Sequence, residues 1–248
     1  MNPLDLPGYV PRTLDIVVLY HGGCPDGFGA AFAAWMFYRN TEHRVQYIPV
    51  RHYEPIPETA YMADIVYILD FCYSRPKLDH LASIERSVVV LDHHASNERT
   101  LFGFEEHTFD MEHSGSVIAW RYFHRDALLP RLFRHIQDQD LWQWKLTDSK
   151  YIMAYVNYMP HDFEQWLDIM ESIEANSNDI RELGTAILMA ENSMVETMAK
   201  NHAIGNLPGT DISLPIVNAA ILGNRVAHRL IDTTDSPIAA TYFVRADG

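Results

Sequence analysis

Cysteine, basic residues and long apolar runs are all scarce in this 248-residue sequence. Two cysteines, Cys24 and Cys72, are too few for a disulfide scaffold and favour a reducing compartment, most simply the cytoplasm. No apolar run approaches the length of a membrane span and no signal-peptide pattern opens the chain, so we expect no membrane partner. Lysine and arginine total 19 against 33 acidic residues, a formal charge of −14, which argues against binding to duplex nucleic acid.

The most informative stretch that is present runs from Ser87 to His94, where a β-branched apolar run ends in Asp92, His93 and His94. A continuous apolar run of this length is typical of a strand buried on both faces of a parallel sheet. In open α/β sheets the ligand crevice lies at the carboxyl ends of the strands. Because neighbouring side chains of an extended chain point to opposite sides, we expect His93 and His94 to have different roles.

Two other apolar runs end in the same way, one at His21 and one at Asp70. Ser74 suits the cap of the helix that follows better than Asp70 does, which leaves the Asp70 carboxylate available. A buried carboxylate needs a cationic partner. Since strand ends of one sheet converge, we expect these side chains to share one site with an acid from the Asp138–Asp140 stretch.

The alternation of strands and helices predicts an α/β fold whose mostly parallel sheet is flanked by helices. We expect this domain over residues 1–150, a helical connector over 151–206, and a small, incomplete α/β lobe over 207–248. The predicted strands are 14–20, 45–50, 65–69, 87–91, 212–219 and 238–244, and the predicted helices are 28–38, 76–84, 117–123, 128–137, 163–204 with a break at 176–178, and 221–231. Residues 1–13 are predicted to be irregular and 148–161 to be rich in turns.

A mixed set of imidazoles and carboxylates suits hard to borderline divalent ions, and it fits Mn²⁺ better than a thiolate-rich structural zinc site. A carboxylate such as Asp70 can bridge two ions. Two ions about 3.5–4 Å apart can activate water and hold both the attacking and the leaving oxygen of a phosphoryl transfer. The residues therefore favour hydrolysis of phosphate esters or anhydrides.

Four ordered motifs carry a resemblance to a known family: HGGCPDG (21–27), DFC (70–72), LDHH (91–94) and QDQDLW (137–142). They resemble the N-terminal motifs of the DHH phosphoesterase family, named for its Asp-His-His signature, over residues 14–145. That family includes single-strand exonucleases, phosphodiesterases of short oligonucleotides and cyclic nucleotides, manganese pyrophosphatases and exopolyphosphatases. The resemblance implies a catalytic domain of the DHH type at the N-terminal end.

By this resemblance, one metal ion would be held by His21 and Asp26, Asp70 would bridge, and a second ion would be held by His93 and Asp138. Asp138 is preferred to Asp140 because it stands where the family's fourth-motif aspartate falls, and Asp140 would brace the turn. The ions would be two Mn²⁺, with Mg²⁺ or Co²⁺ as substitutes.

The two remaining residues of the signature would act on the substrate: His94 would face the phosphate, and Asp92 would orient a histidine. Separately, Ser114, Gly115 and Ser116 open a predicted helix. Exposed amides and hydroxyls at a helix N-terminus cap the helix and also form an anion site, so we expect them to contact the substrate phosphate.

The sequence departs from the family in two places. One carboxylate of the first motif is missing, since Gly23, Cys24 and later Phe28 stand around Asp26, and Cys24 either occupies that neighbourhood or is a small buried cysteine. No glycine-rich, histidine-bearing substrate loop occurs before Gly248.

We expect a manganese-dependent phosphohydrolase acting on phosphodiester bonds of short single-stranded oligonucleotides or of mononucleotides, cyclic ones included. Two alternatives stay open: a pyrophosphatase or exopolyphosphatase acting on phosphoanhydrides, and a nucleotide-binding module of weakened activity. Whether the chain forms a homodimer is left open as well.

Overall fold

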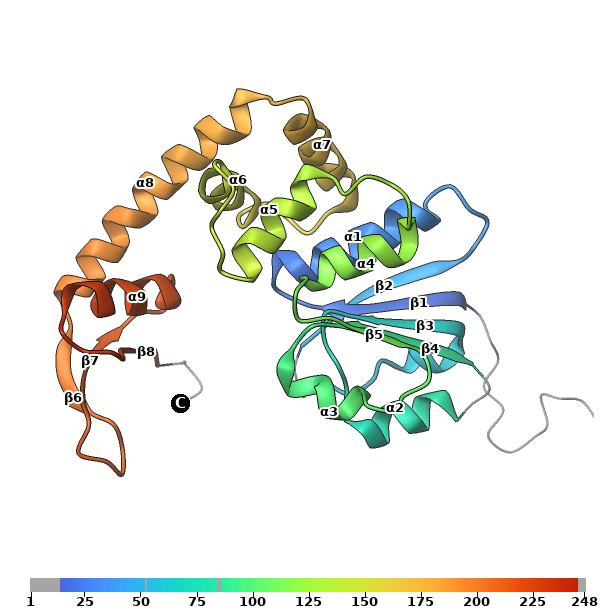
Figure 1. Cartoon of the computed structure of the whole chain (residues 1–248), viewed down its shortest axis with the longest axis horizontal. Helices are drawn as coiled ribbons and strands as arrows, with labels where there is room; N and C mark the ends of the chain where they lie inside the picture. The colour runs from blue at the N-terminus through green and yellow to red at the C-terminus, as the bar shows by residue number, and fades with distance from the viewer. Residues whose placement is uncertain (1–13, 52, 84–85, 245–248) are drawn as a thin grey trace, which may run out of the picture. The chain divides into compact units, whose positions relative to one another are not determined.

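A computed structural model describes residues 14–51, 53–83 and 86–244 (Figure 1). The chain divides into two compact units, Met1–Arg181 and Glu182–Gly248, and the division falls inside helix α8 (Asn178–Lys200). It does not coincide with the boundaries predicted at residues 150 and 206. The segment 1–13, predicted to be irregular, and the last four residues, which belong to the predicted C-terminal lobe, lie outside the described residues.

The first unit is built on a five-stranded sheet in the order β2-β1-β3-β4-β5. Its strands are β1 (Leu14–His21), β2 (Val45–Val50), β3 (Ala63–Leu69), β4 (Ser87–Asp92) and β5 (His107–Phe109). All four pairings are parallel, which confirms the predicted sheet, although β5 was not predicted. Because β2 and β3 flank β1 on opposite sides, the strand order reverses there, and such a reversal is where open α/β sheets bind ligands.

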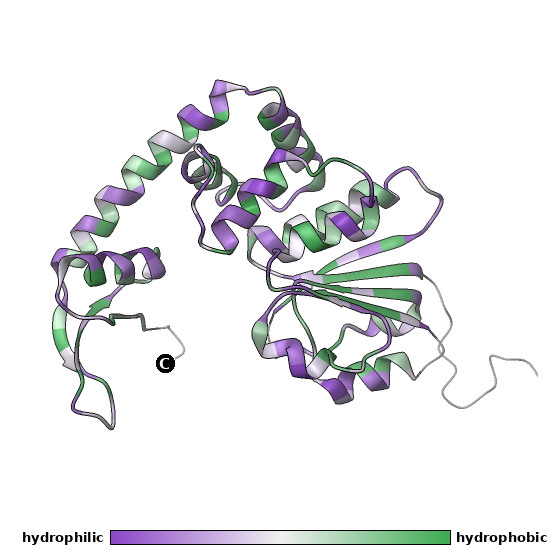
Figure 2. Cartoon of the chain, in the orientation of Figure 1, coloured by the Kyte–Doolittle hydropathy of each residue, from purple (hydrophilic) through white to green (hydrophobic). Residues whose placement is uncertain are grey.

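Helices cover both faces of this sheet (Figure 1). One face is covered by α1 (Pro25–Tyr38) and α4 (Gly115–His124), and the other by α2 (Arg75–Ala82) and α3 (Glu98–Leu101). Short 3₁₀ turns lie at η2 (Glu58–Met62) and η3 (Ala95–Asn97). Alternate residues of β1 enter the two cores, Val18 on the α1 side and Val17 on the α2 side, so the strands are apolar along their length (Figure 2).

Three more helices, α5 (Arg131–Asp140), α6 (Ser149–Val156) and α7 (Phe163–Glu174), extend the core on the α1 side. Trp166 of α7 is fully buried there. The prediction that residues 148–161 are rich in turns is wrong for the first half of that range, which forms α6. Ile152, Met153 and Val156 recur at helical spacing and are buried.

The second unit holds a three-stranded sheet in the order β6-β7-β8. Its elements are β6 (Ala203–Asn206), β7 (Ser213–Asn218), α9 (Gly223–Thr233) and β8 (Ala240–Tyr242). The predicted strand, helix and strand of this lobe are confirmed, as is the break near Asn176, but β6 begins before the predicted helix was expected to end. Among the described residues, no helix is both long enough and apolar enough to cross a membrane.

Candidate metal centre

Three neighbouring strands deliver their last polar side chains to one edge of the sheet. β1 ends at His21, Asp70 follows β3, and His93 and His94 follow β4. Asp70 is 1% exposed and has a φ of +63°, a left-handed conformation that aspartate tolerates better than most side chains do. Its backbone N–H donates to the Leu91 carbonyl at 2.8 Å, which anchors the turn to β4. Strained backbone of this kind clusters at functional sites.

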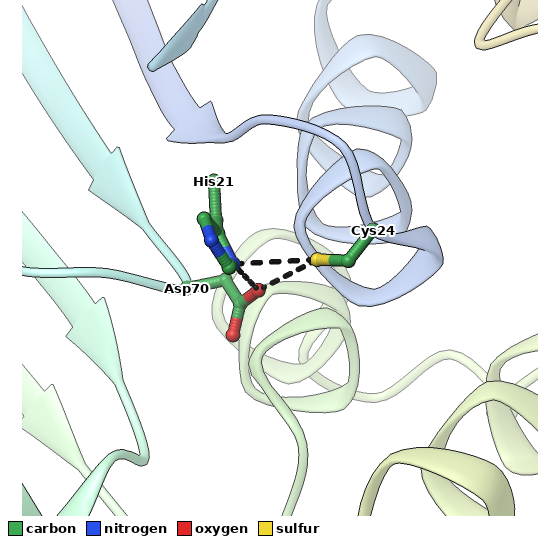
Figure 3. Close-up of side chains that lie close together, drawn as sticks. All are labelled: His21, Cys24 and Asp70. Carbon is green, nitrogen blue, oxygen red and sulfur yellow. Dashed lines mark hydrogen bonds and ion pairs between the residues drawn. The ribbon is translucent and has the colours of Figure 1, made fainter. Parts of the chain in front are cut away.

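The Asp70 carboxylate lies between two histidines. Its Oδ2 is 3.4 Å from His21 Nδ1, and its Oδ1 is 3.2 Å from His93 Nε2. The Cys24 thiol completes a triangle with His21 and Asp70, with Sγ 3.6 Å from Asp70 Oδ2 and 3.3 Å from His21 Nδ1 (Figure 3). The structure therefore places Asp70 centrally, where a bridging ligand would stand, while the bridging role itself stays a prediction.

Asp26 also lies near His93, with Oδ2 3.8 Å from Nε2. The same carboxylate contacts the first residues of α4, where a substrate phosphate was expected. Its buried carboxylate accepts hydrogen bonds from the backbone amides of Gly115 at 2.7 Å and Ser116 at 3.0 Å. The hydroxyls of Ser114 and Ser116 are fully buried and hydrogen-bond to each other at 3.0 Å. Because the Gly115 and Ser116 amides already donate to Asp26, these hydrogen bonds do not favour the phosphate contact expected of Ser114, Gly115 and Ser116, which stays a prediction.

The fourth motif also differs from its prediction. Asp138 turns away from the cluster, and its carboxylate accepts hydrogen bonds from the backbone N–H groups of Lys145 and Leu146 at 2.8 and 3.1 Å. Asp140 instead places Oδ2 3.5 Å from His93 Nε2. The positions of the two acids differ from the prediction: Asp138 holds the turn after α5, and Asp140 lies beside His93, while the choice of metal ligand between them stays a prediction.

The rings of His93 and His94 are only 4.4 Å apart between centroids, so the expectation that they point to opposite sides is wrong. The strand ends at Asp92, and the chain turns immediately into η3, which removes the alternation of an extended backbone. His94 Nδ1 lies 2.8 Å from Asp92 Oδ1. Asp92 is fully buried and also accepts from the amide side chain of Asn97 at 2.6 Å. Asp92 thus contacts a histidine as predicted, and its orienting function stays a prediction.

Burial and mutual charge shift the titration of these groups. Burial raises the pKa of Asp26 well above its ordinary value, and the charges of Asp70 and Asp140 add to this. Burial would raise the pKa of Asp70 too, but its close contacts with the His21 and His93 imidazoles outweigh it and lower that pKa. Burial disfavours protonation of His93, yet its contact with Asp70 raises its pKa to about 9. Three carboxylates thus lie close enough to repel one another, which is the electrostatic condition that a bound cation relieves.

These residues fit a divalent cation. Within the described part of the chain, Asp70 Oδ1 and His93 Nε2 are buried and have no hydrogen-bond partner, although buried polar atoms are normally paired. Three sets of potential ligand atoms, each within 4.8 Å, overlap at Asp70 and His93: His21, Cys24 and Asp70; Asp70, His93 and His94; and Asp26, His93 and Asp140. Oxygen and imidazole donors dominate, as hard to borderline ions prefer.

Two glycines allow helices to begin against the strand ends. A Cβ on Gly27 would overlap the His21 carbonyl oxygen, and one on Gly115 would lie 2.5 Å from Asp70 Oδ1. Cys24 caps α1 by accepting the Gly27 N–H at 3.3 Å, and proline opens the first turn. Gly27 and Gly115 are therefore required by close approach of the backbone.

Asp140 is the residue of the cluster that the sequence reasoning missed, and a signal for it exists. Asp140 stands four residues after Ile136 and seven after Phe133, both of which are buried in the core under the sheet. Positions spaced by four and seven lie on one face of a helix, so Asp140 continues the line of these buried residues, although its own side chain, at the last residue of α5, is 30% exposed.

No family model matches the chain. It is 32% identical over 168 residues to an uncharacterized protein of Acanthamoeba polyphaga mimivirus, a match that covers 62% of this chain and 40% of that protein. The chain thus spans about two fifths of the length of this curated relative.

Solved structures share the fold. An uncharacterized protein from Helicobacter pylori G27 has a TM-score of 0.53 and 12% identity, with 89% of this chain and 80% of that chain covered. RecJ from Thermus thermophilus in complex with Mn²⁺ has a TM-score of 0.52 and 14% identity, with 92% and 43% covered. The exonuclease RecJ bound to manganese has a TM-score of 0.51 and 15% identity, with 92% and 76% covered. The chain therefore has the α/β fold of RecJ, as the resemblance implied.

Proposed function

We propose that this chain is a metal-dependent phosphohydrolase that cleaves phosphodiester bonds of short single-stranded oligonucleotides or of cyclic mononucleotides, with Mn²⁺ as its ion. One observation carries the proposal: Asp70 Oδ1 and His93 Nε2 are buried 3.2 Å apart, at a strand-order reversal, and neither atom has a hydrogen bond to any other described residue. Two structures of the same fold, both of RecJ, hold manganese, which supports the choice of ion.

The ligand set proposed from the structure is His21, Asp26, Asp70, His93 and Asp140, with Asp140 in the place first given to Asp138. Divalent ions bound there would lower the pKa of a water molecule and offset charge on the phosphoryl group. Asp26 is held by two amides of α4 and Asp70 by its turn, so the carboxylates are positioned before any ion arrives.

His94 is the residue proposed to contact the substrate phosphate. Its side chain is 36% exposed, whereas that of His93 is 9% exposed, so His94 is the imidazole that a ligand reaches from solvent. The hydrogen bond that His94 Nδ1 donates to the Asp92 carboxylate raises the pKa of His94, which favours the protonated form that donates to an anion. Asp92 acts as a positioning residue for this ring.

Nucleotides are preferred to polyphosphate as substrates because of charge. A phosphoanhydride chain needs dense positive charge around it, and the sequence has 19 basic residues against 33 acidic ones. A phosphodiester carries one charge for each linkage, which bound cations and one imidazolium can offset.

The test is an assay with Mn²⁺ on a dinucleotide, a cyclic mononucleotide and polyphosphate, with Asp70→Asn as the inactivating variant. Asparagine tolerates the left-handed backbone of Asp70, so the variant is expected to fold. We expect kcat/KM on the nucleotide substrates to fall roughly 100-fold or more, since a bridging charge is lost. Asp79→Asn is the matched control, because Asp79 pairs with Arg75 on the exposed side of α2.

Full activity of Asp70→Asn would overturn the proposal. If the chain hydrolyses polyphosphate and neither nucleotide, the proposed substrate class changes from phosphodiesters to phosphoanhydrides. Binding of nucleotide with no turnover of any substrate would identify a binding module instead.

A further inference from the structure

The cluster contains a thiol among ligands that are otherwise oxygen and imidazole. We propose that Cys24 is a ligand of the ion held by His21 and Asp70, and that this position selects Zn²⁺ over Mn²⁺ and Mg²⁺. The inference rests on the proposed function for the existence of the metal centre. It adds that the two metal positions differ in chemistry: a thiolate-containing one at His21, and an oxygen-rich one at His93.

The geometry of the three side chains matches a metal corner. The atoms His21 Nδ1, Cys24 Sγ and Asp70 Oδ2 are separated by 3.3, 3.4 and 3.6 Å (Figure 3). Ligand atoms bound tetrahedrally at 2.0–2.3 Å lie about 3.3–3.6 Å from one another. Their side chains converge from the end of β1, the cap of α1 and the turn after β3, so no large rearrangement is needed to hold an ion.

A second observation points to a ligand independently of the cysteine. The Asp70 side chain is 2% exposed, and its other oxygen, Oδ1, has no hydrogen-bond partner among the described residues while it faces the cluster. Although Oδ1 lies 3.2 Å from His93 Nε2, a carboxylate buried to this extent with an oxygen that no hydrogen bond satisfies is expected to meet a cation. Cys24 therefore lies against a group that already requires one.

Burial and the charges of Asp70 and Asp26 raise the pKa of the Cys24 thiol, so a bound cation is needed to displace its proton. The sulfur is at the N-cap of α1 and accepts the Gly27 N–H at 3.3 Å, so a backbone dipole already points at it. On binding, the S–H bond breaks, its proton leaves to solvent, and the sulfur electron pair forms the bond to the ion. No oxidant or reductant takes part.

Thiolate ligands favour zinc among the ions considered, whereas Mn²⁺ and Mg²⁺ prefer oxygen. If Cys24 were only a helix cap, replacing it would leave metal selectivity unchanged. Serine is a better N-cap than cysteine, so Cys24→Ser keeps the cap and is expected to fold. Cys24→Asp supplies a carboxylate in place of the sulfur.

The experiment uses Co²⁺ as a spectroscopic substitute for Zn²⁺ in the full chain, freed of metal. We expect wild type to develop a near-ultraviolet thiolate-to-cobalt charge-transfer band that saturates with bound Co²⁺. Cys24→Ser is expected to lose the band, and its Zn²⁺ affinity to fall roughly 10-fold or more while Mn²⁺ affinity changes less. Cys24→Asp is expected to shift the preference from Zn²⁺ toward Mn²⁺. Cys72→Ser is the control, because Cys72 donates to the Tyr73 carbonyl and takes no part in the three ligand sets.

The outcomes separate the two proposals. Stoichiometric Co²⁺ binding without a charge-transfer band, or a band that survives in Cys24→Ser, would overturn the cysteine assignment and leave the phosphohydrolase proposal standing. A chain that binds no divalent ion would overturn both. Manganese-dependent hydrolysis with equal Zn²⁺ affinity in wild type and Cys24→Ser would overturn the selectivity alone.

Discussion

Buried histidines occur in two regions of the first unit, and the two regions affect their protonation in opposite ways. At the sheet edge, the carboxylates around His93 raise its pKa to about 9 despite burial. In the helical layer, burial lowers the pKa of His135 and of His124. His135 pairs with the Ser149 hydroxyl at 2.8 Å, and His124 stacks on Trp120 with ring centroids 4.0 Å apart.

The difference lies in the partners and not in the depth of burial. A neutral hydroxyl beside His135, or the Ala33 carbonyl 2.9 Å from His124 Nε2, pairs with an imidazole without offsetting the cost of burying its charge, so the ring is held neutral as part of the core. Carboxylates stabilise a positive charge, and they stabilise a divalent cation in the same place. Burial alone therefore does not tell whether a histidine is a core residue or a candidate metal ligand. The presence of carboxylates around it distinguishes the two.

The largest expected effect comes from the two acids of the fourth motif. Asp140→Asn should weaken Mn²⁺ binding by roughly 10-fold or more, because it removes a charge beside His93, with little change in stability. Asp138→Asn should leave Mn²⁺ affinity nearly unchanged and lower the free energy of unfolding by about 1–3 kcal/mol, since it accepts two backbone N–H groups. Calorimetric titration and denaturant unfolding measure the two quantities. The reverse pattern would restore the role first predicted for Asp138.

A second change acts on the sheet edge through shape alone. In Gly115→Ala the new Cβ would lie 2.5 Å from Asp70 Oδ1 and 2.6 Å from Asp70 Cβ, so Asp70 or α4 must move. We expect a loss of about 1–3 kcal/mol in stability together with weakened Mn²⁺ binding, because the same contact fixes the central carboxylate. Thermal unfolding with and without Mn²⁺ measures both. An unchanged stabilisation by Mn²⁺ would show that the position of Asp70 is not critical.

The smallest effect concerns the helical layer. A histidine with a lowered folded-state pKa binds fewer protons folded than unfolded, so its contribution to stability is present above the unfolded pKa of about 6.5 and is lost as pH falls through the folded pKa. His135→Gln keeps a hydrogen-bonding side chain toward Ser149 and removes the titration. The loss of stability between about pH 7 and pH 5 should be smaller in this variant than in wild type. Identical pH profiles in metal-free protein would contradict the assignment.

The sheet and the edge that carries the site were predictable from sequence because both depend on local patterns. The run before Asp92 and the one before Asp70 are apolar without alternation, as strands buried on both faces must be. Neighbouring parallel strands bring their carboxyl ends to one edge of the sheet, whatever the connections between them. The strand pattern alone therefore predicts that His21, Asp70 and His93 lie at one edge.

The partners of the acids were not predictable in the same way. The amides that hold Asp26 belong to α4, about ninety residues away, so nothing near Asp26 indicates that the helix N-terminus is already taken. Asp138 and Asp140 are two residues apart on one helix and therefore face nearly opposite directions, and motif alignment alone does not decide which faces His93. The role of Cys24 depends on two residues, His21 and Asp70, that only the fold brings around it.

The central claim is that the carboxylates and imidazoles at this sheet edge hold divalent ions. Anomalous diffraction from crystals grown with Mn²⁺ tests it most directly. We predict an anomalous peak within bonding distance of Asp70 and His93, with Asp140 and not Asp138 among its ligands. A peak elsewhere on the chain, or none at this edge at saturating Mn²⁺, would contradict the claim.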